Sequence, residues 1–331
     1  MEFSEILYKR FTLKKENLYA FFTFSIVFLW SLIVYPWYIE GDQSSYRLFY
    51  EEVKGLSLVD TYLRQLPIIG GLEPGYSIVV YSFSEIFNKD IIFSFINGLI
   101  GALLYKICRL YSYSTFIFIG ILTSFYSSVI FFAAERLKLG ILVILIAFLF
   151  KDNFKRLFIL SGAILFHLQS LFALLLFFIY KLTRRANLVR LYKFKLDGIN
   201  KYFLLILALS FLVIYLDLFN FFIQKAGNYI SKAELNFDML KPIILGVPAL
   251  LIGRDKFLHF ALLIFWTSAG LFIDTDRVVM MQVLSIIFLL DSKKNKIFNW
   301  AYLSSLFIYF FIKNIIFIID IYNCGEGFTC R

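Results

Sequence analysis

The residues with the clearest chemical potential are three charged side chains inside an apolar stretch. Glu135, Arg136 and Lys138 stand between long hydrophobic runs on both sides. Charged groups at bilayer depth are costly and usually have a function. Two interpretations are open. The three charges form a tight turn outside the membrane, or Arg136 faces a cavity and binds a negative group there. Arginine suits phosphate because its guanidinium stays charged and presents a planar fork of donors.

Other polar residues could complete a site around this arginine. Arg277 follows Asp276 at a turn between two apolar runs, and His167 lies in the middle of another apolar segment. Two arginines could hold a pyrophosphate without a metal ion. Either His167 or Asp42 could take a proton from an attacking hydroxyl. Asp42 also suits a helix N-cap, and His167 also suits a packed position in an uninterrupted helix.

Glu73 is the remaining candidate, although it precedes a proline and could simply mark the start of a helix. The expected topology brings Asp42, Glu73, Arg136, His167 and Arg277 to the outer third of the membrane. We therefore predict that these residues border one external-facing cavity, with Asp42 and Glu73 at its rim.

Composition decides the class of protein that must position these residues. The chain has 331 residues, of which 60% are hydrophobic and 20% aromatic, and its mean hydropathy is +0.79. The apolar runs are continuous, which predicts an all-α polytopic membrane protein and not a barrel. The net charge of +10 does not indicate nucleic acid, because the basic residues cluster beside apolar runs as the positive-inside rule expects.

Several chemistries are set aside because their motifs are missing from the sequence. There is no phosphate-binding loop of the ATPase type, no hydrolase nucleophile elbow, and no cluster with metal-ligand spacing. We expect neither a metal nor a cofactor. Cys324 and Cys330 could pair if the C-terminal tail faces an oxidising compartment.

The first third of the chain is expected to leave the cytoplasm once and form an external loop. Basic residues precede a first span at Leu18–Trp37, which places the N-terminus in the cytoplasm. Residues 38–72 then form an extracytoplasmic loop that contains an amphipathic helix on the membrane surface. Residues 75–88 are too short for a span and are expected to be half-inserted, whereas Asp90–Arg109 crosses. The apolar side of the amphipathic helix consists of Tyr46, Phe49, Tyr50 and Val53.

Beyond residue 109, basic clusters mark cytoplasmic turns, the largest being a basic loop at 181–201. Ser114–Ala134 has the length of one hydrophobic helix. Leu157–Tyr180 lies between two basic clusters and is too short for two full spans, so it should be a pair of short broken helices. In total we expect about 10 or 11 crossings in a single membrane domain that covers residues 1–331.

The order of the polar motifs resembles one known family. The chain is similar to the EpsG-like group of Wzy-type polysaccharide polymerases. The resemblance extends from Asp42 to about Leu290, and Leu137 departs from it where the family commonly has glutamine. The motifs that carry the resemblance are Gly41-Asp42-Gln43-Ser44-Ser45-Tyr46, Glu73-Pro74-Gly75-Tyr76, Ala134-Glu135-Arg136-Leu137, Phe166-His167-Leu168-Gln169-Ser170 and Asp276-Arg277.

The resemblance implies a glycosyltransferase of the GT-C kind in a bacterial inner membrane. It would join undecaprenyl-pyrophosphate-linked repeat units into O antigen, capsule or exopolysaccharide, beside a flippase and a chain-length regulator. Arg136, Arg277, His167 and Asp42 would be catalytic. The residues expected to bind substrate are Tyr46, Glu73, Glu135 and Asp276.

Two alternatives stay open from the sequence. A flippase for lipid-linked sugars would use the same arginines without chemistry. A structural or lipid-binding membrane protein would not need these residues in one place.

Overall fold

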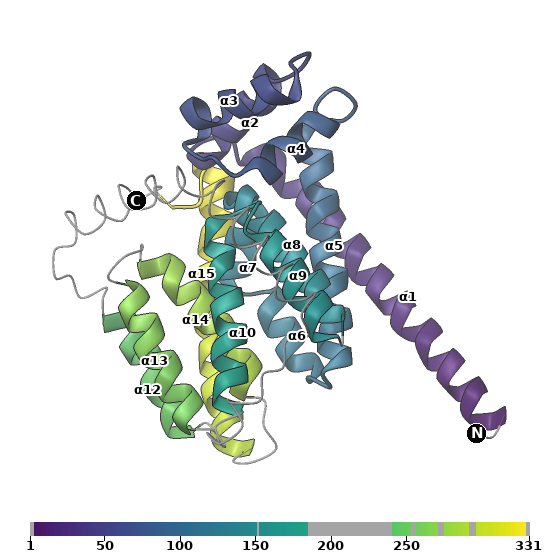
Figure 1. Cartoon of the computed structure of the whole chain (residues 1–331), viewed down its shortest axis with the longest axis vertical. Helices are drawn as coiled ribbons and strands as arrows, with labels where there is room; N and C mark the ends of the chain where they lie inside the picture. The colour runs from purple at the N-terminus through teal and green to yellow at the C-terminus, as the bar shows by residue number, and fades with distance from the viewer. Residues whose placement is uncertain are drawn as a thin grey trace, which may run out of the picture. The chain divides into compact units, whose positions relative to one another are not determined.

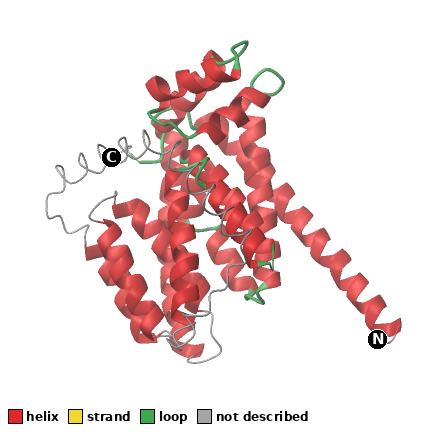
Figure 2. Cartoon of the chain, viewed as in Figure 1, coloured by secondary structure: helices red, strands yellow, loops and turns green. Residues whose placement is uncertain are grey.

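The computed structural model describes residues 3–150, 152–184, 240–252, 256–270, 275–290 and 296–328. These residues form helices and connecting turns, with no strand among them (Figures 1 and 2). Three of the described helices are long and apolar enough to cross a membrane, and a bent pair raises this number to four. The protein is thus an all-α membrane protein, as the composition predicted. It divides into two compact units, residues 1–174 with 303–331 and residues 175–302.

The first unit is built on two paired spans. α1 (Phe3–Val34) packs along α5 (Lys89–Leu110), and both contain candidate spans, as predicted. The close approach depends on small residues of α5, because a Cβ at Gly98 would lie 2.8 Å from the ring of Phe24. A 3₁₀ turn, η1 (Tyr35–Trp37), follows α1.

Three short helices connect these two spans. They are α2 (Asp42–Glu52), α3 (Leu58–Ile69) and α4 (Pro74–Phe83), and Figure 1 draws them together near the start of α5. The sequence correctly predicted a helix after residue 41. Its apolar side is buried within the protein, however, and not exposed as a surface helix would require. Tyr46 and Phe49 are buried because their rings pack against Tyr76 of α4.

The expected single helix at Ser114–Ala134 is broken. It consists of α6 (Thr115–Leu122), α7 (Phe125–Ser128) and a π-helical turn, η2 (Val129–Ala133). The two halves meet at an angle of 54°. The break occurs at Ser124, whose hydroxyl accepts a hydrogen bond from the amide of Ser127 and so starts a new helix.

Two further helices and a short 3₁₀ element complete the part of this unit that bears on the site. α8 (Glu135–Leu149) begins directly after the π turn. The segment near His167 is indeed broken, as predicted: α9 (Asn153–Ala163) ends in turns, and a short 3₁₀ element, η3 (Leu168–Ser170), precedes α10 (Leu171–Arg184). Gly140 of α8 allows η3 to approach, because a Cβ there would lie 2.3 Å from the Ser170 hydroxyl.

The second unit contains α12 (Lys241–Ile252), α13 (Lys256–Gly270) and α14 (Thr275–Leu290). The amide of Gln282 donates to the Pro242 carbonyl at 2.7 Å, which joins α14 to α12. α15 (Lys296–Cys324), which from Leu303 onward belongs to the first unit, contains the last candidate span. Cys324 is disulfide-bonded, while Cys330, the basic segment from 185 to 201 and residues 202–239 lie outside the described residues.

Candidate functional site

Arg136 occupies the second position of α8 and makes the central contact of the site. Its Nη1 donates to the Glu73 carboxylate at 2.7 Å. Its Nε donates to the Tyr46 hydroxyl over a longer distance of 3.5 Å. The Arg136 side chain keeps 14% exposure, and among the described residues its Nη2 makes no hydrogen bond. Nε and Nη1 are therefore engaged by protein, and Nη2 is the guanidinium nitrogen that remains for an anion.

His167 contacts the same carboxylate. Its Nδ1 lies 3.4 Å from Glu73 Oε1, so Glu73 bridges an arginine and a histidine that come from different motifs. The turn that precedes His167 is tied to the start of α4, because the amide of Gly75 donates to the Leu165 carbonyl at 2.9 Å. A carboxylate at this position can orient an imidazole and leave Nε2 as the nitrogen that takes a proton.

The loop that carries Glu73 is fixed from α3. Gln65 of α3 is fully buried and its amide donates to the Glu73 carbonyl at 3.2 Å. The hydroxyl of Ser77 donates in turn to the Gln65 side-chain oxygen. This buried polar chain holds the backbone of Glu73 and leaves its carboxylate for Arg136 and His167.

A glycine beside this loop allows the ion pair to form. A Cβ at Gly71 would lie 1.7 Å from Arg136 Nη1 and 2.5 Å from Glu73 Oε2. The guanidinium thus lies directly against the Gly71 backbone, where a side chain would push it away.

Electrostatics keep the two acidic groups of the site in different states. Burial opposes ionisation of Glu73, but Arg136 and His167 outweigh it, so the pKa of this carboxyl is lower than usual. Burial raises the pKa of the Tyr46 hydroxyl, although Arg136 acts in the opposite direction. Glu73 is consequently a carboxylate at neutral pH and Tyr46 a neutral phenol, which excludes Tyr46 as a base in this state.

Glu135 points away from this site into a buried network. Its side chain is fully buried and Lys89 Nζ lies 2.5 Å from Oε1. The Tyr76 hydroxyl donates to Oε2 at 2.9 Å. Lys138 is also fully buried, and it donates to the Tyr35 hydroxyl and to the Phe131 carbonyl. The cluster Glu135–Lys138 is therefore not a solvated turn, and Glu135, predicted to bind substrate, is enclosed by protein.

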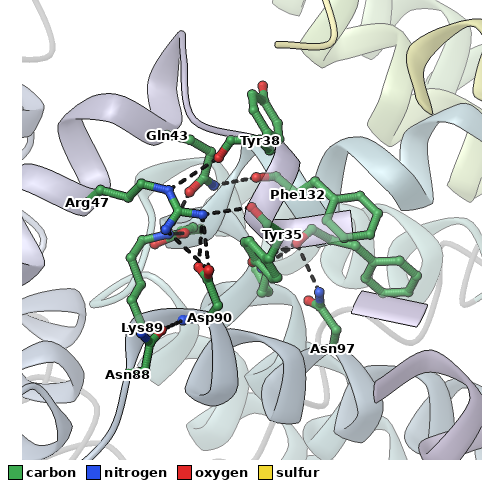
Figure 3. A network of polar contacts seen from close by, with 12 residues as sticks. Tyr35, Tyr38, Gln43, Arg47, Asn88, Lys89, Asp90, Asn97 and Phe132 are labelled. Atoms are coloured by element: carbon green, nitrogen blue, oxygen red, sulfur yellow. Dashed lines mark hydrogen bonds and ion pairs between the residues drawn. The ribbon is translucent and has the colours of Figure 1, made fainter. Parts of the chain in front are cut away.

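Side chains of the same network donate hydrogen bonds to the irregular backbone at the end of the broken span. The Phe131 carbonyl also receives the Asn97 amide at 3.0 Å, and the Phe132 carbonyl receives the Gln43 amide. Figure 3 shows Asn97 and Gln43 beside this backbone, while Lys89 donates to the Gln43 side-chain oxygen and Arg47 bridges Asp90 and the Tyr35 carbonyl. Non-helical backbone in a membrane protein must be paired in this way.

Asp42, Arg277 and Asp276 are the remaining predicted residues. Asp42 is exposed at the first position of α2, and it is not the N-cap, since Gly41 occupies that position without a side-chain hydrogen bond. Arg277 is exposed near the start of α14 in the second unit. Asp276 belongs to the same helical turn. A shared site of Arg277 with Arg136 stays a prediction.

Sequence reasoning missed Lys89, Gln65 and Gly71. Lys89 follows Asn88 at a helix start, where a lysine normally marks a solvated end. Gln65 carried no signal, because an amide in a short helix is ordinary. Among the described residues, no group of three or more His, Cys, Asp or Glu side chains could hold a metal ion.

Comparisons with protein-family models, with curated proteins and with solved structures gave no match to this chain.

Proposed function

We propose that this chain is a membrane glycosyltransferase that joins lipid-pyrophosphate-linked oligosaccharide units on the extracytoplasmic side. The observation that supports this best is the contact of Arg136 and His167 with one carboxylate, Glu73. A permanent cation and an imidazole side by side are the two groups that such a transfer needs. One stabilises a departing pyrophosphate and the other receives a proton.

The reaction would proceed as a substitution at the sugar. The acceptor hydroxyl oxygen forms a bond to the anomeric carbon, and the bond from that carbon to the pyrophosphate oxygen breaks. The leaving pyrophosphate takes the electron pair and would be stabilised by the positive charge and the Nη2 donor of Arg136. The hydroxyl proton passes to His167, whose Nδ1 lies 3.4 Å from the Glu73 carboxylate, or else to Asp42.

The other site residues take supporting roles. Arg277 would be the second arginine on the pyrophosphate, with Asp276 beside it. Tyr46 and Glu73 would line the sugar-binding side. Glu135 would act from behind the site through the start of α8.

The wider setting is part of the same proposal. We infer a GT-C-like arrangement with 10 or 11 crossings, a cytoplasmic N-terminus and a bacterial inner membrane. The product would be O antigen, capsule or exopolysaccharide, made from undecaprenyl-pyrophosphate-linked units. The partners would be the lipid-linked substrate, membrane lipid, a flippase and a chain-length regulator.

Reconstitution with synthetic lipid-linked repeat units tests the proposal. Purified protein in liposomes should convert the units into a ladder of longer products. His167→Ala should still bind the lipid pyrophosphate but extend it more slowly, by about 100-fold or more for a general base. Translocation of the units without a ladder would instead identify a flippase, and no binding would reject both functions.

A further inference from the structure

α3 has an inverted distribution of polar and apolar residues. Thr61 and Gln65, one helical turn apart, are fully buried. On another side, Val59, Leu63 and Leu66 are 66%, 64% and 41% exposed. Positions four and seven residues from Val59 lie on the same face of a helix. The helix therefore turns polar groups toward the protein and an apolar stripe outward, the reverse of a helix on a water-soluble domain.

A third side of α3 carries its charges. Asp60 and Arg64 are exposed and separated by one turn. Arg64 lies 3.8 Å from the carboxylate of Glu52 in α2, and both side chains are accessible. The charged stripe follows the apolar stripe directly around the helix axis, so one side suits water and the adjacent side suits hydrocarbon.

The place of α3 in the chain says which surface covers the apolar stripe. It belongs to the connection between α1 and α5, both of which contain candidate spans. α4, which packs beside α3, also exposes Ile78 and Tyr81. At 12 residues, α3 would be about 18 Å long, too short to cross a hydrocarbon core of about 30 Å.

We propose that α3 lies in the plane of a membrane interface, with Val59, Leu63 and Leu66 among the lipid acyl chains. The depth typical of such helices is about 5–10 Å below the headgroup boundary. Asp60 and Arg64 face the aqueous side. The inner side of α3 holds Glu73 through Gln65, so the lipid surface sets the depth of the Glu73 carboxylate. This inference does not rest on the proposed function.

Fluorescence quenching in liposomes tests the position of each stripe. Single cysteines replace Leu63 or Asp60 in the full chain, with Cys108→Ser as the background and the Cys324 disulfide retained. Each is labelled with an environment-sensitive fluorophore. The label at Leu63→Cys should be quenched by phospholipids brominated on the upper acyl chain and protected from aqueous iodide. The matched label at Asp60→Cys should show the opposite pattern.

Two results would overturn the proposal. Equal iodide quenching at both sites would place the apolar stripe in water. Protection from both quenchers at Leu63→Cys would mean that protein, and not lipid, covers it. Because both positions are exposed, neither variant disturbs the buried packing, and a second pair, Val59→Cys and Arg64→Cys, repeats the comparison one turn away.

Discussion

Glu135 and Arg136 are neighbours in the chain, yet they serve two different environments. Glu135 is enclosed with Lys89 and Lys138 behind the start of α8. Arg136 emerges on the other side, partly exposed, with Glu73 and His167. Buried charges must be paired and hydrogen-bonded within the protein, whereas the partly exposed Arg136 donates to protein through Nε and Nη1 and keeps Nη2 for a ligand. The comparison suggests that the enclosed cluster is a framework and the partly exposed one is the site.

The largest expected effect is loss of the enclosed carboxylate. Glu135→Leu would leave Lys89 buried without its ion-pair partner, which should destabilise the protein by about 3–5 kcal/mol. Thermal unfolding in detergent would measure the loss. The double variant Lys89→Met/Glu135→Leu is the control, and it should recover much of the stability because an apolar pair replaces the ions. A single variant that melts like the parent would contradict the framework role.

Arg136→Lys should instead leave stability nearly unchanged and remove activity. Lysine keeps the charge beside Glu73 but lacks the planar fork. Loss of one such donor typically costs on the order of 100-fold in rate, measured as ladder formation at matched membrane levels. A full ladder from this variant would show that the position needs only a positive charge.

Acidification should remove the stability that the Glu73 carboxylate contributes. Its pKa is lowered in the folded state, so the stability that its ionised form contributes is present above the unfolded pKa of about 4.3 and is lost as the pH falls through the lowered value. At neutral pH, Glu73→Gln should be about 1.5–3 kcal/mol less stable than the parent, the range for a charge-assisted hydrogen bond. The difference between their melting temperatures should shrink below about pH 4.3. A difference in melting temperature that does not change with pH would mean that the charge of the Glu73 carboxylate contributes nothing to stability.

The smallest effect is expected from Gly71→Ala. The added methyl would meet Arg136 Nη1 at 1.7 Å, but this guanidinium ends a flexible side chain and can shift. Activity should fall by about tenfold or less, which corresponds to about 1.4 kcal/mol, with little change in melting temperature. Gly162→Ala is the matched control, because a Cβ there meets no atom within 4 Å. Equal activity in the two variants would mean that the position of Arg136 is not critical.

The sequence by itself determined the class of the protein and the candidate functional residues. Continuous apolar runs require helices, since hydrocarbon cannot pair backbone groups. A segment too short for two spans requires a break near His167. Arg136 was a candidate because its charge interrupts an apolar stretch, where no local feature of the sequence explains a charged residue.

Only the tertiary structure decided which polar residues form a site and which form a framework. Helical periodicity reports which residues share a face but not what covers that face. The aromatic side of α2 was therefore predicted to face lipid, although in the structure it packs against Tyr76. In the same way, Lys89 and Gln65 have their partners in other helices. Their burial depends on how those helices pack together, which the local sequence pattern does not indicate.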